Sequence, residues 1–178
     1  MTVHRTTPLP ERASSGRLIV AESVLPVTRA ALEASSGEHG RHEGLVLWLG
    51  RTISRDRQLV ATLVASVATP PTKATDGSVF VDEDAVGDAS RAARAVGLGV
   101  VAQVHSHPGH DTRHSDGDDR LIVMPFGGMF SLVVADFGRG SMLPTDGAGL
   151  HQYQDGVWVR VVNDDAMLLA PTHVSIGS

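Results

Sequence analysis

The chain has 178 residues, of which 42% are hydrophobic and 20% charged, and this composition fits a single globular domain. It contains no cysteine, which excludes disulfides, thiolate catalysis and a thiolate zinc site, so metal chemistry would need His, Asp and Glu. The formal net charge of −5 argues against general binding to nucleic acid or anionic membranes, and no apolar run is long enough to span a bilayer.

The two ends of the chain differ in composition from its middle. The first residues lack the apolar core of a signal peptide, so we expect a cytoplasmic protein. Residues 1–16 contain proline and serine with few apolar side chains, which predicts a flexible leader. We expect one domain over residues 17–162 and a partly ordered tail over residues 163–178.

Strands and helices alternate along the predicted domain. Apolar runs bounded by glycine or proline predict strands, and helical spacing of apolar and alanine residues predicts helices. In chain order the expected elements are a strand at 17–21, a helix at 28–35 capped by Thr28, strands at 43–51, 59–67 and 79–81, a helix at 82–96 capped by Asp82 or Asp84, a strand at 99–104, a short helix at 115–125, and strands at 129–137 and 157–162. The glycine-rich region 138–150 is predicted to be a flexible loop. This order predicts an α/β fold in which helices cover a sheet.

Two histidines stand where the predicted strand 99–104 ends. His105 and His107 are two residues apart, so their side chains point to the same face of an extended chain. Pro108 ends the strand, and Asp118 lies in the first turn of the next predicted helix. Two histidines, one carboxylate and an open fourth position form the ligand set of a catalytic zinc site. We therefore predict Zn²⁺ at His105, His107 and Asp118, although manganese or iron occupies similar ligand sets.

Glu43 is the candidate general base. It heads the predicted strand 43–51, which is otherwise nearly all apolar, and a carboxylate there needs a function or a partner. A metal-dependent hydrolase needs a carboxylate that takes a proton from water and returns it to the leaving amine. The alternative is an ion pair between Glu43 and Arg41 or Arg51.

These residues carry a family resemblance that covers roughly residues 25–137. The stretch His105-Ser106-His107-Pro108, followed after six residues by Ser115 and after two more by Asp118, resembles the JAMM motif of MPN-domain zinc metalloproteases. Glu43 and the apolar run after it, up to Gly50, resemble the upstream glutamate strand of that family. The resemblance implies one MPN-like domain, with a mixed central sheet flanked by helices. It implies zinc on the two histidines and the aspartate, Glu43 as acid and base, and Ser115 as hydrogen-bond donor to the oxyanion.

The resemblance also implies a class of substrate. Enzymes of this family are peptidases or isopeptidases that cleave after the C-terminal glycine of ubiquitin or a ubiquitin-like protein. Bacterial relatives of this length, which are deubiquitinase-like, look like partners of ubiquitin-like or sulfur-carrier conjugation systems and their other components. The substrate-gripping insertions of eukaryotic deubiquitinases are not recognisable, which argues against ubiquitin itself. Two alternatives stay open: a non-catalytic MPN scaffold that binds a partner protein, and a metallo-hydrolase that removes a small peptide or amino acid from a carrier.

Several candidate residues have a structural alternative. The spacing of Ser115 and Asp118 is also that of a helix capping box, and both roles are compatible. Asp119 is the alternative third ligand, and Asp116 is expected to be a solvated charge. The remaining histidines are not expected to be ligands: His42 is expected to be structural, His110 and His114 solvated or facing the substrate, and His4, His39, His151 and His173 at the surface.

The aromatic and basic residues near these motifs have two interpretations each. Trp48, at the centre of an apolar strand, is expected in the core. Trp158 and Tyr153 fit either a core or a substrate surface. Arg113 and Arg120 fit a solvated face better than a surface for an acidic partner.

Overall fold

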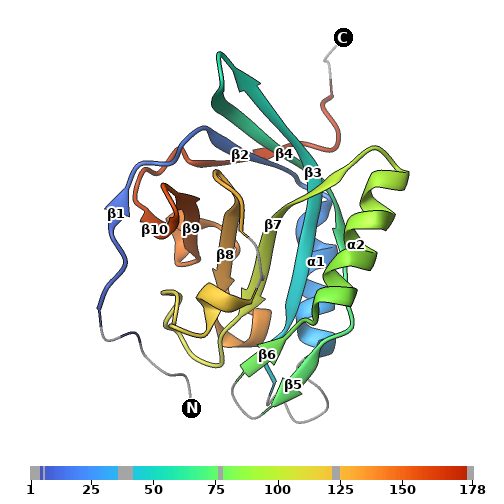
Figure 1. Ribbon diagram of the computed structural model, residues 1–178, viewed down its shortest axis with the longest axis vertical. Coiled ribbons are helices and arrows are strands. Elements are labelled where there is room, and N and C mark those ends of the chain that lie inside the picture. The colour runs from blue at the N-terminus through green and yellow to red at the C-terminus, as the bar shows by residue number, and fades with distance from the viewer. Residues whose placement is uncertain (1–4, 6, 36–41, 76–77, 122–124, 176–178) are drawn as a thin grey trace.

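A nine-stranded mixed sheet forms the body of the protein in a computed structural model that describes residues 5, 7–35, 42–75, 78–121 and 125–175 (Figure 1). The strand order is β1-β10-β9-β8-β7-β3-β4-β2-β11, and β5 pairs separately with β6. The strands are β1 (Glu11–Arg12), β2 (Arg17–Ala21), β3 (Leu45–Arg55), β4 (Gln58–Ala68), β5 (Lys73–Thr75), β6 (Ser78–Phe80), β7 (Gly99–Ser106), β8 (Phe130–Val134), β9 (Gly149–Gln154), β10 (Val157–Val161) and β11 (Met167–Ala170). The described helices are α1 (Val24–Ser35) and α2 (Glu83–Ala95), with 3₁₀ turns η1 (Asp118–Arg120), η2 (Asp136–Gly138) and η3 (Pro144–Asp146).

The first part of β3, from Leu45 to Gly50, is buried on both faces because a helix packs on each side of it, whereas its last residues are exposed. Val46 and Trp48 belong to the larger apolar core, which also contains Leu32 of α1. The alternate residues Leu45 and Leu47 belong to a second core, under α2. This explains the continuous apolar run that predicted a doubly buried strand. Figure 1 shows α1 and α2 on opposite sides of β3.

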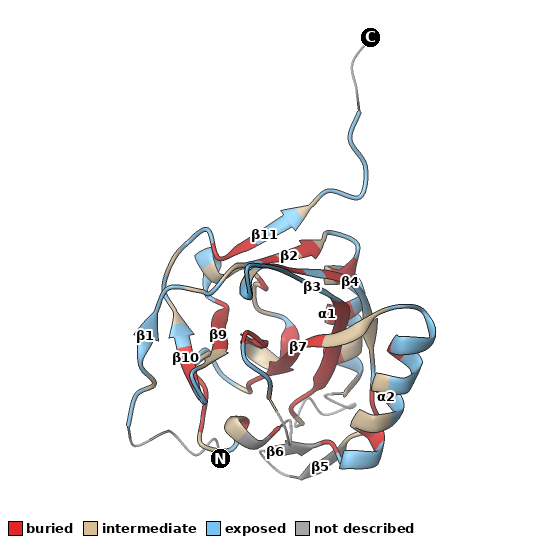
Figure 2. Ribbon diagram, turned by 45° about the horizontal axis from the view of Figure 1, so that its top comes forward, coloured by how far each residue is buried: buried red, intermediate tan, exposed pale blue. Residues whose placement is uncertain are grey.

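Helices cover less of the sheet than an α/β fold flanked by helices implies. The described part of the chain has two α-helices, and the sheet curls so that β2 and β11 lie across one end of the other strands (Figure 2). The sheet contains both parallel pairs (β1–β10, β2–β4, β2–β11 and β7–β8) and antiparallel ones, so it is mixed as expected. None of the described helices is long and apolar enough to cross a membrane.

Three predicted elements differ from the structure. The helix expected at 28–35 begins at Val24, and Thr28 is a buried residue whose Oγ1 accepts a hydrogen bond from Trp48 Nε1 (2.8 Å), not a cap. The helix expected from Ser115 is reduced to the short turn η1, closed by a bond from Leu121 N to Asp118 O (3.2 Å), and residues 122–124 lie outside the described residues. The loop expected at 138–150 contains η3 and runs into β9, an unpredicted strand.

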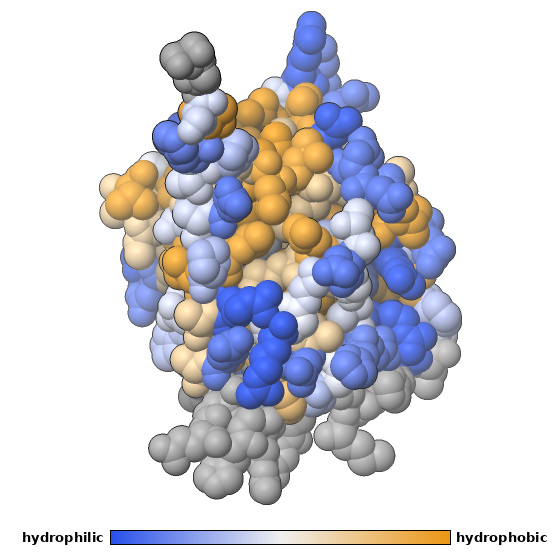
Figure 3. Space-filling model, turned by 180° about the vertical axis from the view of Figure 1, so that it is seen from behind, coloured by the Kyte–Doolittle hydropathy of each residue, from blue (hydrophilic) through white to orange (hydrophobic). Residues whose placement is uncertain are grey.

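Both ends of the described chain add strands to the sheet. β1 lies in the segment expected to be a leader and pairs with β10, while β11 lies in the expected tail and pairs with β2. Each of these strands is only two to four residues long, too short for a period-two pattern to reveal it. Exposed leucines of β4 and β11 (Leu63, Leu168 and Leu169) contribute apolar surface, and Figure 3 shows a hydrophobic area in the upper half of the view from behind.

Candidate metal centre

Two of the expected ligands stand at the buried end of β7, His105 within the strand and His107 immediately after it. β7 lies between antiparallel β3 and parallel β8, and its residues from Val101 to Ser106 are buried. His105 and His107 are 0% and 2% exposed, and their ring centroids are 5.1 Å apart. The backbone at His107 is fixed by a bond from His107 N to Val134 O (2.9 Å). The two rings therefore converge at the point where the central strand ends.

Asp118 brings a carboxylate to both rings. Its Oδ2 lies 3.4 Å from His105 Nε2 and 3.1 Å from His107 Nε2, and one ligand atom from each of the three residues lies within 4.8 Å of the others. Two ligands on a tetrahedral zinc ion, each about 2.0–2.1 Å from it, are about 3.4 Å apart. The spacing of the donor atoms therefore fits a zinc ion without rearrangement of the backbone.

The hydrogen bonding and protonation of the two histidine rings also suit metal binding. Nδ1 of His107 donates to the carbonyl oxygen of Asp111 (2.7 Å), which leaves the lone pair of Nε2 directed at the site. The two nitrogens of His105 are buried without a hydrogen-bond partner among the described residues. Burial lowers the pKa of His105, which favours the neutral, metal-binding form. A metal ion bound here would provide a partner for the buried His105 imidazole, which lies beside the Asp118 carboxylate.

Ser115 and Asp118 form the reciprocal contacts of a capping box. Ser115 N donates to Asp118 Oδ2 (2.6 Å), and Asp118 N donates to Ser115 Oγ (3.3 Å). Burial would raise the pKa of Asp118, but His105 and His107 outweigh it and hold that pKa well below its usual range. Asp118 is thus an ionised carboxylate whose orientation is set by the turn that Ser115 begins. The capping box of Ser115 and Asp118 is therefore compatible with metal binding by Asp118.

Glu43 lies one residue before a fixed contact between β3 and β7. Ser106 N donates to Gly44 O (3.0 Å), and Gly44 N donates to Ser106 Oγ (2.9 Å), so Glu43 is placed near His107 and Asp118. The Glu43 side chain is buried, and burial raises its pKa to about 7, with His107 lowering it and Asp118 raising it less strongly. A carboxyl group that titrates near neutral pH is suited to general base catalysis. 

The expected partners of Glu43 are placed elsewhere or outside the description. Arg51 donates through Nε to Gly97 O (2.8 Å), so it is engaged at the opposite end of the strand. Arg41 lies outside the described residues. The ion-pair alternative with Arg51 is therefore wrong, and the described residues include no other basic group in an ion pair with Glu43.

Two histidines that were expected to be solvated are buried beside the site. His114 and His151 are 2% and 1% exposed, and their rings stack at 4.2 Å. The ring of His114 lies 5.7 Å from that of His105. The loop approaches β9 closely, because a Cβ on Gly149 would lie 1.8 Å from Thr112 O. Leu150, His151, Gln152 and Tyr153 do not alternate between apolar and polar side chains, so the sequence carried no period-two signal of β9.

The remaining aromatic, histidine, arginine and aspartate candidates differ in burial and in their contacts. Trp48 is in the core as predicted, and Trp158 is also buried, edge-on to His114 (5.0 Å) and Tyr153 (5.4 Å). His110 and His173 are exposed, His42 is half-buried, and His4 and His39 lie outside the described residues. Arg113 is exposed and pairs with Asp111 (2.7 Å). Asp119 points away from the ligands, since it contacts Arg5 and His114. 

Two solved structures share this fold. Protein DSY2949 from Desulfitobacterium hafniense superposes with a TM-score of 0.62 at 15% identity, over 86% of this chain and 93% of that one. A protein from Salinibacter ruber (strain DSM 13855) has a TM-score of 0.53 at 22% identity, over 82% of this chain and 91% of that one. At these identities the similarity concerns the fold alone.

Sequence comparison identifies the family. The probable metalloprotease y4jG of Sinorhizobium fredii (strain NBRC 101917 / NGR234) is 35% identical over 106 residues, which cover 59% of this chain. The match spans 63% of that relative, less than two thirds of its length. Residues 28–142 match the family described as prokaryotic homologs of the JAB domain. This match covers most of the chain and includes His105, His107 and Asp118, so the chain belongs to the prokaryotic homologs of the JAB domain, a JAMM-like family.

Proposed function

We propose that this protein is a zinc-dependent peptidase or isopeptidase that cleaves the amide bond after the C-terminal glycine of a ubiquitin-like or sulfur-carrier protein. The observation that carries the proposal is the group of His105, His107 and Asp118, whose donor atoms have the spacing of zinc ligands, with Glu43 buried beside it. The similarity to a probable metalloprotease supports the same chemistry.

Each site residue has a distinct task in this proposal. When bound by the three ligands, zinc supplies Lewis acidity that acidifies a water molecule and polarises the scissile carbonyl. The Glu43 carboxylate takes a proton from the attacking water and delivers it to the leaving amine, which a group with a pKa of about 7 can do in both directions. The Ser115 hydroxyl donates a hydrogen bond to the carbonyl oxygen as negative charge develops there.

The proposed substrate class comes from the family resemblance of the motif. A ubiquitin-like protein ends in a flexible glycine tail, which can enter a site that a folded chain cannot. We propose that the reaction takes place in the cytoplasm, together with other components of a conjugation system. Fractionation of cells that express an epitope-tagged chain tests this location.

The substitution Glu43→Gln tests the mechanism. The purified full chain, loaded with zinc, is assayed on ubiquitin-like and sulfur-carrier proteins fused through their C-terminal glycine to a reporter. We expect about a 10²- to 10⁴-fold lower turnover for Glu43→Gln with zinc content unchanged, because only the proton transfer is removed. Turnover equal to that of the wild type at full zinc content would exclude Glu43 as the base.

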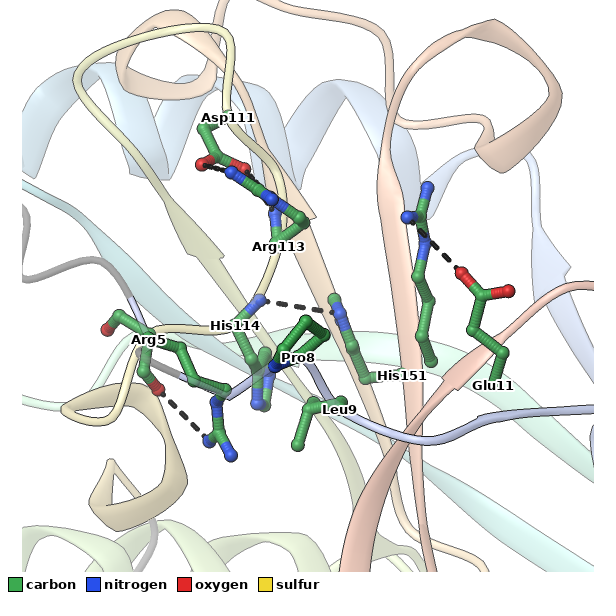
Figure 4. A pocket seen from close by; sticks show the side chains of 10 residues that line it. Arg5, Pro8, Leu9, Glu11, Asp111, Arg113, His114 and His151 are labelled. Atoms are coloured by element: carbon green, nitrogen blue, oxygen red, sulfur yellow. Dashed lines mark hydrogen bonds and ion pairs between the residues drawn. The ribbon is translucent and has the colours of Figure 1, made fainter.

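A second candidate is removal of a single amino acid or short peptide from a carrier protein. The observation that favours it is a cavity of about 80 Å³ beside Ser115, lined also by Arg5, Leu9, His114 and His151 (Figure 4). This space holds only a few water-sized groups. A chain that releases an amino acid from such adducts but leaves intact protein fusions uncut would favour this candidate over the first.

A further inference from the structure

The first described residue, Arg5, reaches across to the loop that carries Ser115 and Asp118. Its guanidinium forms a short ion pair with Asp119, lies 3.5 Å from Asp116 Oδ1, and donates to Ser115 O (3.5 Å). Figure 4 shows the Arg5 side chain directed at this loop. The Arg5 side chain is 18% exposed, so the contact is partly shielded from solvent.

The second oxygen of Asp119 contacts a buried group. Oδ1 of Asp119 lies 3.4 Å from His114 Nδ1, while His114 Nε2 lies 2.8 Å from Ser131 Oγ. Ser131 Oγ also accepts from Gln103 Nε2 (3.0 Å), so its proton is free to point to His114 Nε2, which leaves a proton on His114 Nδ1 for Asp119. A hydrogen-bonded chain thus runs from β7 through β8 and His114 to Asp119 and ends at Arg5.

The segment after Arg5 is attached to the body of the protein. Arg160 N donates to Pro10 O (2.8 Å), and Val162 N donates to Arg12 O (3.1 Å). Ser15 N donates to Gln152 Oε1 (2.7 Å). Arg5 is therefore presented to the loop by a segment fixed to β9 and β10, which limits the entropy that its ion pair with Asp119 must overcome.

Asp118 and Asp119 are neighbours with opposite tasks. The carboxylate of Asp118 points at His105 and His107, whereas that of Asp119 is held between Arg5 and His114. We propose that Arg5, Asp119 and His114, here called the Asp119 clamp, are positioning residues that orient the ligand Asp118 in the turn η1. This inference rests on the proposed zinc site and adds the N-terminal segment to it.

The direction in which zinc affinity changes when Arg5 is replaced distinguishes a positioning role from a purely electrostatic one. Arg5 is a cation near a cation site, so its charge alone weakens zinc binding, and its removal would tighten it. The clamp predicts the opposite, because a loosened turn places Asp118 less accurately. Groups that orient metal ligands contribute about 10- to 100-fold to metal affinity. We therefore expect Arg5→Met to weaken the zinc affinity of the full chain by about 10-fold.

The experiment measures the zinc dissociation constant by competition with a chromophoric chelator, together with thermal unfolding of the zinc-free chain. The single variants are Arg5→Met, Arg5→Lys and Asp119→Asn. The double variant combines Arg5→Met with Asp119→Asn. Arg17→Met and Asp165→Asn are the matched controls, since that ion pair (2.8 Å) is exposed and joins the start of β2 to the turn before β11. The controls should keep the affinity within about twofold, because an exposed pair of this kind contributes little.

Each outcome decides the inference. The clamp predicts weaker zinc binding for Arg5→Met and for Arg5→Lys, which keeps the charge and loses the planar fork. It also predicts little further loss when Arg5→Met is added to Asp119→Asn. Unchanged or tighter zinc binding in Arg5→Met and Arg5→Lys, or a lower melting temperature with unchanged affinity, would overturn it while leaving the proposed function intact. A wild type that binds no zinc would overturn both.

Discussion

The two faces of the strands β7, β8 and β9 are equally buried but chemically opposite. On one face Val104, Leu132 and Leu150 lie side by side in register and are at most 2% exposed. On the other face Gln103, Ser131 and His151 lie in register and are at most 1% exposed. The apolar row packs in the core that α1 covers, whereas the polar row is covered by the site loop through His114.

This contrast separates stability from function within one sheet. Apolar burial contributes about 25 cal/mol per Å² of area removed from water, which the polar row does not gain. Buried polar groups instead need partners with good geometry, and satisfied networks fix one arrangement of side chains. We therefore expect substitutions on the apolar face to change the free energy of unfolding, and substitutions on the polar face to change metal binding and turnover.

The largest effect is expected where the polar face meets the ligands. His107→Ala removes one of the three proposed zinc ligands and should abolish stoichiometric zinc binding and catalysis. Zinc at 100 times its dissociation constant stabilises a protein by about 2.7 kcal/mol, so the zinc-dependent rise in melting temperature should also vanish. Elemental analysis and thermal unfolding with and without chelator measure both changes. About one zinc per chain in His107→Ala would contradict the assigned ligand set.

A cavity on the apolar face should have a large effect of a different kind. Leu132 is 1% exposed, and Leu132→Ala is expected to lower the free energy of unfolding by about 2–5 kcal/mol. The zinc dissociation constant of the folded chain should stay within about threefold, since Leu132 lies on the face opposite to that of Ser131, which contacts His114. Urea unfolding of the zinc-free chain and chelator competition give the two quantities. A zinc affinity that falls along with stability would show that the faces are coupled.

The buried Glu43 should make the zinc-free protein sensitive to pH. Its folded pKa, raised to about 7, exceeds its unfolded pKa, so the folded chain binds more protons between pH 4.5 and 7 and loses stability as pH rises through this window. Glu43→Gln removes this loss. We expect the variant to be more stable than the wild type by about 3 kcal/mol at pH 8 and nearly equal at pH 4.5. A stability difference that does not depend on pH would contradict the raised pKa.

The sequence predicted the ligand group because its geometry is local. His105 and His107 share a strand end, and one short loop returns Asp118 to them, so strand periodicity and a turn suffice. Predicting that Glu43 lies near these residues required only that the predicted strands 43–51 and 99–104 be neighbours in the sheet. The burial of His114 and His151 depends instead on the register of β8 with β9, which no local pattern encodes. The contact of Arg5 with Asp119 joins residues 114 positions apart, so no local sequence pattern could predict it either.

The smallest effect is expected at the β9 end of the polar row. His151 Nδ1 is buried without a partner among the described residues, and Nε2 accepts only a long bond from His114 N (3.4 Å). His151→Phe keeps the ring stack on His114, removes an unsatisfied polar atom and leaves the His114 N–H without its weak acceptor. Each of the last two changes is worth about 1–3 kcal/mol with opposite signs, so they nearly cancel. The free energy of unfolding should therefore change by less than about 1 kcal/mol, measured in urea at pH 7. A loss of several kcal/mol would show that the stacked histidines, and not the apolar row alone, hold these strands together.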